Sequence, residues 1–188
     1  MEDSKEVTMQ DLLSELQILK DRTTQLENAR QDQLSIAIIS GDMDKIMAGM
    51  IISLAAAAMD TKVKLFFSFW GISALRDPKK KAEGKSFISK MFGMMLPKSK
   101  NKLKLSKYNM LGMSPVIMKK LMKEQGVMSL DEMFKQAGEL GVEITICEMT
   151  MNLMGFKKEE LIDYPNMRIA GAATFVADAG ESAMQWMI

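Results

Sequence analysis

The chain has 188 residues, of which 47% are hydrophobic and 26% are charged, so it can bury the core of one α/β domain with a tail or an insertion. Its net charge of +1 does not indicate a nucleic-acid-binding protein, and its polar opening, MEDSKEV, is not a secretory signal. The sequence has no histidine and one cysteine, which excludes Ser-His-Asp and Cys-His catalysis, histidine-based metal sites and an internal disulfide.

The first predicted element is an amphipathic helix within residues 1–32. Its apolar seam alternates steps of three and four residues and consists of Met9, Leu12, Leu16, Leu19, Thr23 and Leu26. A helix with this heptad seam either lies on its own domain or forms a short coiled coil between subunits. The roughly three heptads available favour neither arrangement, and the polar Thr23 and the next seam position, Arg30, weaken the seam toward its end.

An α/β domain is predicted over residues 33–188, because apolar, β-branched segments alternate with segments of helical pattern. The predicted strands are residues 33–40, 62–69, 142–147 and 166–171. The predicted helices are residues 42–59, 113–126, 129–141, 157–162 and 172–186. Asp42 is the expected N-cap of the first helix, and Ser129 with Glu132 forms an expected capping box. This order favours a parallel sheet covered by helices on both faces.

A basic insertion at about residues 77–107 interrupts the alternation of strands and helices. Between Arg76 and Lys107 the chain has a net charge of +9, and it contains the apolar, methionine-rich segment 87–97. One interpretation is a solvated lysine-rich loop whose apolar piece packs on the domain. The other is a lid or a docking surface for an acidic partner or a membrane surface, and the shortness of the apolar piece disfavours the membrane.

Two nucleotide-binding fingerprints and a long membrane span are absent from the sequence. Gly-Lys-Ser at residues 84–86 lacks the upstream glycine of a phosphate loop, and no G-x-G-x-x-G occurs. The longest apolar run, residues 46–59, is shorter than the about 20 residues that span a bilayer, and we interpret it as a core helix. The 21 methionines follow helical core spacing, so we expect packing rather than copper ligation, no metal and no other cofactor.

The lone thiol of Cys147 ends the predicted strand 142–147, and chemistry in parallel sheets collects beyond the carboxyl ends of strands. The following residues predict a turn into a short helix, with Thr150 as its N-cap. Lys157 and Lys158 would lower the pKa of the thiol and Glu148 would raise it, so the sequence leaves the direction open. The thiol is either a small buried hydrophobe or a slow group carrier that needs no general acid, metal or second cysteine.

The string C-x-M-T-M-x-L-M-G at residues 147–155, with FFSFWGISALR at residues 66–76, resembles the DsrE/DsrF-like family. The resemblance covers residues 33–188 and is strongest to the branch with a long insertion after the second strand, often labelled peroxiredoxin-like. It implies a three-layer α/β sandwich with about five parallel strands, assembly as trimers or multiples of trimers, and cytoplasmic sulfur relay. It further implies that Cys147 carries persulfide sulfur between rhodanese-like and TusA-like partner proteins. The peroxidase pattern P-x-x-x-[TS]-x-x-C is absent before Cys147.

Several further residues are expected to line the site around Cys147. They come from the turns after the first, second and third strands and from the end of the insertion: Asp42, Trp70, Gly71, Arg76, Asn109, Met110, Gly112, Met149 and Thr150. For Trp70 the competing interpretation is core packing, and for Asp42 it is helix capping.

Three functions compete on these observations. The first is a cytoplasmic sulfur carrier, or sulfurtransferase, that uses a persulfide on Cys147. The second is a non-catalytic oligomeric scaffold that docks a partner through the basic insertion, and the third is a binder of an anionic small ligand held by the lysines. An enzyme with rapid turnover ranks last, because no acid–base pair is apparent.

Overall fold

The computed structural model describes residues 9–29, 31–80, 82, 87–107 and 113–188. The chain divides into two compact units, residues 1–31 and residues 32–188. In the first unit, residues Met9–Ala29 form the helix α1, and the side chains from Met9 to Gln25 are exposed. The predicted N-terminal helix is confirmed.

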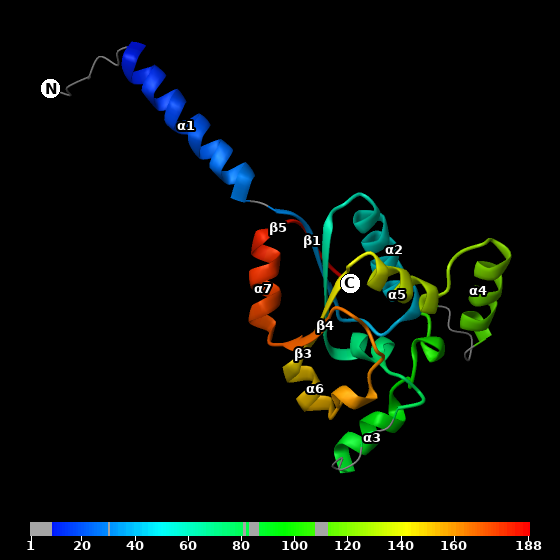
Figure 1. The fold of residues 1–188 in the computed structure, drawn as a ribbon. Coiled ribbons are helices and arrows are strands. Elements are labelled where there is room, and N and C mark those ends of the chain that lie inside the picture. The colour runs from blue at the N-terminus through cyan, green and yellow to red at the C-terminus, as the bar shows by residue number, and fades with distance from the viewer. Residues whose placement is uncertain (1–8, 30, 81, 83–86, 108–112) are drawn as a thin grey trace. The chain divides into compact units, whose positions relative to one another are not determined.

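The second unit is built on five parallel strands in the order β4-β3-β2-β1-β5 (Figure 1). The strands are β1 (Gln31–Ile38), β2 (Lys62–Phe67), β3 (Glu143–Cys147), β4 (Met167–Ala170) and β5 (Ser182–Met187). Neighbouring strands from β1 to β4 pair in parallel, in a register that sets Ile38 beside Phe67 and Cys147 beside Ala170. Ile188 bonds to the backbone of Ala37 and Ile39 in the parallel pattern, which joins the end of β5 to β1.

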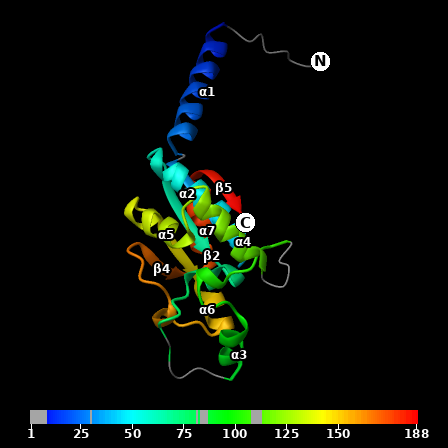
Figure 2. The ribbon, with the colours of Figure 1, turned by 90° about the vertical axis from the view of Figure 1, so that its right-hand side faces the viewer.

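Helices cover both faces of the sheet, so the predicted three-layer α/β sandwich is confirmed (Figures 1 and 2). Helices α2 (Met43–Ala58) and α5 (Leu130–Glu139) lie on one face, and α7 (Ala172–Glu181) lies on the other. Adjacent residues of β2 show the division, because side chains alternate between the faces of a strand. The ring of Phe67 packs on Phe134 of α5, and the ring of Phe66 packs on Phe175 of α7, with centroids 6.2 and 5.3 Å apart respectively.

The two faces of the sheet are held by different forces. The face toward α2 and α5 is the apolar core and includes Leu34, Ile36, Ile38, Val63, Leu65, Phe67, Ile144 and Ile146. The face toward α7 is largely polar. There Asp178 of α7 forms ion pairs with Lys64 and Arg168, and Arg168 also donates to the Thr145 hydroxyl at 2.9 Å. Hydrogen bonds and ion pairs therefore contribute much of the docking of α7.

Most predicted helices and strands agree with the structure, but the predicted end of the last helix is wrong. The capping box of α5 is confirmed, since Ser129 N–H donates to the Glu132 carboxylate at 2.7 Å and Glu132 N–H donates to the Ser129 hydroxyl at 3.3 Å. The helix predicted over residues 172–186 ends at Glu181, and the next six residues form β5. These residues form a strand rather than a helix because they pair with β1, which is distant in sequence. The helix predicted over residues 157–162 is a single 3-10 turn, η4 (Lys158–Glu160).

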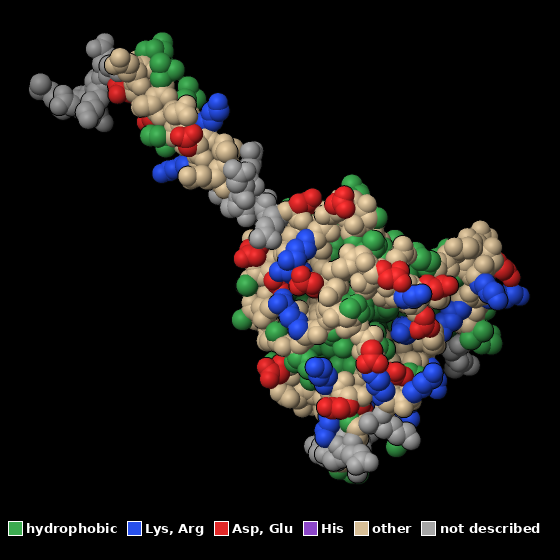
Figure 3. Space-filling view, in the orientation of Figure 1, with side chains coloured by type: hydrophobic (Ala, Val, Ile, Leu, Met, Phe, Trp, Pro, Cys, Tyr) green, Lys and Arg blue, Asp and Glu red, His purple; other side chains and the backbone are tan. Residues whose placement is uncertain are grey.

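The remaining elements are α3 (Phe87–Met95), α4 (Met113–Glu124), α6 (Glu148–Met154) and the 3-10 segments η1 (Phe69–Leu75) and η2 (Lys100–Lys102). Helix α3 and η2 belong to the basic insertion. Part of its positive charge is paired with the domain, as Lys80 contacts Asp163 at 2.5 Å and Lys100 contacts Asp131 at 2.9 Å. Figure 3 shows basic and acidic side chains interspersed on the face of the domain that is turned toward the viewer. Among the described residues no helix is long and apolar enough to cross a bilayer.

Candidate functional site

Cys147 is the last residue of β3 and the N-cap of α6, at the carboxyl edge of the sheet. Its side chain is 1% exposed. Cys147, rather than the predicted Thr150, occupies the N-cap position, and α6 begins at once with Glu148. The strand ends in a tight turn that leaves the thiol among the first backbone N–H groups of α6.

Hydrogen bonds make the thiol more acidic than an ordinary cysteine. Burial raises the pKa of Cys147, but the hydroxyl and N–H of Thr150, the Ser68 hydroxyl and the N–H of Met149 donate to the sulfur. Together these bonds outweigh the burial and lower the pKa below its usual value, because each of them favours the thiolate. The thiol is therefore both shielded from water and partly prepared as a nucleophile.

The two hydroxyls that face the sulfur belong to one buried network. The Ser68 and Thr150 oxygens lie 3.0 Å apart, and Phe69 N–H donates to the Thr150 hydroxyl at 3.3 Å. Thr150 is fully buried and Ser68 is 6% exposed. Phe69 N–H occupies one acceptor position of Thr150, and either of the two hydroxyls can donate to the other.

Phe69 has an unusual backbone conformation, with φ at +44°. This left-handed region is uncommon for a residue with a bulky side chain. With this conformation η1 begins at Phe69, one residue after the turn residue Ser68, and the Phe69 N–H donates to the Thr150 hydroxyl. Strain of this kind persists where the surrounding structure holds it and often accompanies functional sites.

The turns after β1 and β2 pack closely beside this network. Gly71 N–H donates to Ile39 O at 2.9 Å, and a Cβ at Gly71 would overlap the Ile38 carbonyl. A Cβ at Gly41 would likewise crowd the Trp70 carbonyl. Only glycine fits at Gly71, so its role is a close approach of two backbones that holds the β2 turn in place.

The predicted site residues are only partly brought together. Thr150 contacts the thiol, and Met149 and Trp70 are respectively 58% and 46% exposed at the same edge of the sheet. Asp42 occupies the N-cap position of α2, where its carboxylate accepts from the Ser40 hydroxyl at 2.8 Å rather than from the helix. The predicted residues Asn109, Met110 and Gly112 lie outside the described part of the chain.

Arg76 is engaged elsewhere, in the attachment of the insertion. Its guanidinium donates to the carbonyls of Leu96 and Pro97 at 3.2 and 3.0 Å and to that of Gly93 at 3.2 Å, at the end of α3. It also lies 5.3 Å from the centre of the Phe156 ring. A buried cation that satisfies helix-end carbonyls is a structural anchor.

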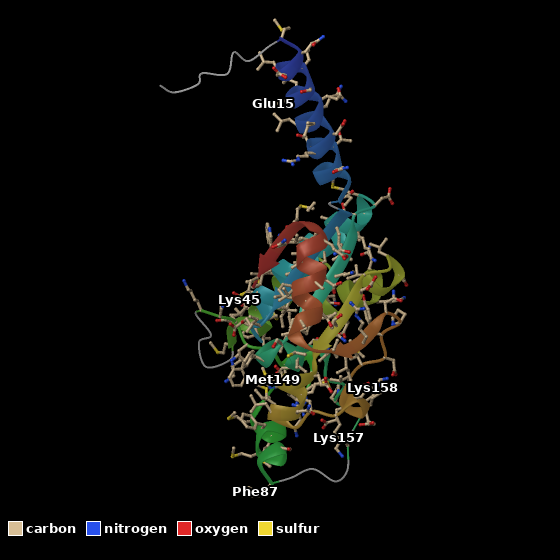
Figure 4. All side chains as sticks on the ribbon, turned by 90° about the vertical axis from the view of Figure 1, so that its left-hand side faces the viewer. Glu15, Lys45, Phe87, Met149, Lys157 and Lys158 are labelled. Carbon is tan, nitrogen blue, oxygen red and sulfur yellow. The ribbon has the colours of Figure 1, made fainter. Side chains whose placement is uncertain are left out.

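The insertion contacts α6, the helix whose N-cap residue is Cys147. Gly155 ends α6 with φ at +67°, and a Cβ there would overlap Ser89 of α3. This contact packs α3 against the C-terminal end of α6. Lys157 and Lys158 follow that same end of α6 (Figure 4), whereas Cys147 caps the other one. The groups that lower the pKa of the thiol are hydrogen-bond donors from α6 and from Ser68, which directly follows β2.

Sequence reasoning missed Ser68; it included Thr150 among the site residues but expected it to be the N-cap of the helix, a position that Cys147 occupies. Ser68 directly follows β2, the strand beside β3, and that position at the carboxyl edge was the available signal. A hollow of about 500 Å³ lies between α2, α4 and α5, and Cys147 is not among its lining residues. Within the described ranges no group of three or more Cys, Asp or Glu residues could hold a metal ion.

Comparisons with known proteins identify the family of the chain. Residues 30–187 match the DsrE/DsrF/DrsH-like family. The chain is 42% identical over 154 residues to an uncharacterized protein, YrkE, from Bacillus subtilis (strain 168), covering 82% of this chain and 95% of YrkE. It is 35% identical over 156 residues to the sulfur carrier protein DsrE2 from Allochromatium vinosum, covering 81% of this chain and 95% of DsrE2. The crystal structure of the ychN protein from E. coli aligns with a TM-score of 0.47 at 10% identity, over 83% of this chain and 99% of that one. On the extent of the family match and of these relatives, the chain belongs to the DsrE/DsrF/DrsH-like family.

Proposed function

We propose that this protein is a sulfur carrier of a cytoplasmic relay and that Cys147 holds the sulfur as a persulfide. The observation that carries the proposal is the set of hydrogen bonds from Ser68, Met149 and Thr150, which lowers the pKa of a buried thiol. A relative that is 35% identical is named a sulfur carrier protein, which supports the same role.

The proposed reaction consists of two thiol exchanges. The Cys147 thiolate attacks the outer sulfur of a donor persulfide, the donor S–S bond breaks, and the donor leaves as a thiolate. The product on this chain is Cys147–S–SH. An acceptor thiolate then attacks the terminal sulfur, which returns Cys147 to the thiolate. No electron is gained or lost overall, so neither step needs an oxidant, a metal or a histidine.

The same hydrogen bonds would serve each state of the thiol. A thiolate reacts where the thiol itself does not, and donors that favour the anion increase its share at neutral pH. They also favour Cys147 as the leaving group when the acceptor attacks, because a more acidic thiol leaves faster. Burial of the sulfur, which is 1% exposed, would protect the persulfide from solvent between the two steps.

Transfer to and from a buried sulfur requires a partner that reaches this edge of the sheet. Trp70 in the turn after β2 and Met149 in the first turn of α6 expose apolar surface there, at 46% and 58% exposure respectively. Exposed apolar residues of this kind are typical of a contact surface. We propose rhodanese-like and TusA-like proteins as the donor and acceptor, and self-association of this chain in trimers or multiples of trimers.

The test is an intact-mass measurement on the reduced full-length protein after incubation with polysulfide or thiosulfate. We expect a gain of about 32 Da per sulfur, removed by dithiothreitol, in the wild type and no gain in Cys147→Ser. Ser106→Ala, which leaves the thiol in place, is a matched control and should load as the wild type does. If no donor adds sulfur while the folded protein also resists iodoacetamide at Cys147, the carrier proposal is wrong.

A second candidate, binding of a small anionic ligand, rests on the hollow between α2, α4 and α5. Met43, Met122 and Leu130 supply apolar walls, and Lys119 and Lys123 supply positive charge. Binding that survives Cys147→Ser and is lost in Lys119→Ala with Lys123→Ala would support this function over the carrier. Sulfur loading lost in Cys147→Ser and unchanged in the double lysine variant would support the carrier.

A further inference from the structure

Helix α1 displays an apolar stripe along one side of the helix. The side chains of Leu12, Leu16 and Leu19 are respectively 47%, 62% and 58% exposed. Three leucines in one row of a 21-residue helix are an unfavourable surface to leave in water. A single helix of this length is also only marginally stable by itself, since most helical stability in proteins comes from packing of an apolar face.

The spacing assigns each residue of α1 a position in a heptad written abcdefg. With Met9 and Leu16 at position a, Leu12 and Leu19 fall at position d, which completes the inward seam of a coiled coil. The polar residue in the seam, Thr23, is accommodated within its own helix. Its hydroxyl donates to Leu19 O at 2.9 Å, so it needs no partner across the seam and leaves its methyl group for packing.

The charges that flank the seam specify the orientation of the partner. Glu15 occupies a g position and Lys20 the following e position, five residues later. In a parallel, in-register coiled coil, a g residue of one helix lies beside the next e residue of the other, so Glu15 would face Lys20 of the second copy. Arg22 and Glu27 repeat the same g-to-e relation with the charges reversed. Figure 4 marks Glu15 on α1.

We infer that α1 pairs in parallel and in register with α1 of a second copy of this chain. Both g-to-e relations become attractive in this arrangement, and the leucines of one helix pack against their own counterparts. An antiparallel pair would instead set g beside g and e beside e, which loses this matching. The inference does not depend on Cys147 or on sulfur transfer.

The first test measures which faces of two α1 helices meet, using disulfide crosslinking of the full-length chain. In a Cys147→Ser background, Leu12→Cys places the only thiol at a d position, and Ser14→Cys places it at the outward f position. With oxidised glutathione as oxidant, we expect Leu12→Cys to form a covalent dimer at least about tenfold faster than Ser14→Cys. Both residues are exposed, so neither change disturbs the core.

Equal rates at the two positions, or no dimer at Leu12→Cys, would overturn the inference. Either result would be expected if α1 lies on its own domain or pairs in the antiparallel direction. Because the background lacks Cys147, a failure here is separate from a failure of sulfur loading in the wild type.

The second test uses charge reversal and sedimentation equilibrium of the full-length protein. Glu15→Lys and Lys20→Glu each place like charges opposite one another and should each weaken self-association about 2- to 10-fold. The double variant restores opposite charges and should recover the affinity of the wild type. Losses in the single variants that simply add in the double variant would contradict the parallel register.

Discussion

Replacement of Thr150 by valine tests the hydrogen bonds that define the thiol site. Valine has nearly the shape of threonine but lacks the hydroxyl, and Thr150 is fully buried, so the change removes one donor to Cys147 without opening a cavity. A hydrogen bond to a charged group is worth roughly 1.5–3 kcal/mol. Its loss should therefore raise the pKa of Cys147, because one of the donors that favour the thiolate is gone.

The assay is the rate of iodoacetamide alkylation of Cys147 as a function of pH, whose midpoint reports the thiol pKa. We expect a higher midpoint in Thr150→Val and a midpoint near that of the wild type in Thr150→Ser, which keeps the hydroxyl. Ser68→Ala should raise the midpoint too, since Ser68 also donates to the sulfur. Identical midpoints in the wild type, Thr150→Val and Ser68→Ala would refute the argument that side-chain hydroxyls set the acidity of the thiol.

Three other predictions concern stability, each measured by denaturant unfolding under reducing conditions. Because the pKa of Cys147 is lowered in the folded state, ionisation of the thiol stabilises the fold. The unfolding free energy of the wild type, relative to that of Cys147→Ser, should therefore rise with pH between the folded pKa and the unfolded value of about 8.5. A free-energy difference that does not change with pH would contradict this prediction. Gly155→Ala should cost more than Gly126→Ala, since both glycines have φ at +67° but only at Gly155 would a Cβ overlap another segment; equal costs would show that the contact with α3 is not tight. Asp178→Ala should lower the unfolding free energy by roughly 3 kcal/mol, because it leaves the largely buried Lys64 without its ion-pair partner, and a loss under about 1 kcal/mol would count against that role.

Much of the fold could be predicted because its signals are local. The strands β1 to β4 are short apolar runs, and Ser129 and Glu132 cap α5 through residues three apart. Strand β5 carries no comparable signal. Most of its side chains are exposed, and its place in the sheet is beside β1, near the opposite end of the sequence, where Ile188 bonds to the backbone of Ala37 and Ile39.

The candidate site likewise has one feature that could be predicted from local sequence and one that depends on tertiary packing. The place of Cys147 at the carboxyl edge followed from a strand pattern and from the general behaviour of parallel sheets. The direction of its pKa shift did not, because the charges nearby in sequence, Glu148 and Lys157 among them, are not the groups that decide it. The decisive donors are short side chains and N–H groups whose positions depend on how β2 and β3 pair.

The sequence by itself determined the class of the fold, the heptad seam of α1 and the location of the single thiol, since each depends on residue type and spacing along the chain. Only the tertiary structure decided what surrounds that thiol. It placed Ser68, which follows the neighbouring strand β2, against Thr150, and it placed the Arg76 guanidinium on carbonyls of the insertion rather than near the sulfur. Hydrogen bonds act over about 3 Å, so their partners become known only when distant segments of the chain have been packed together.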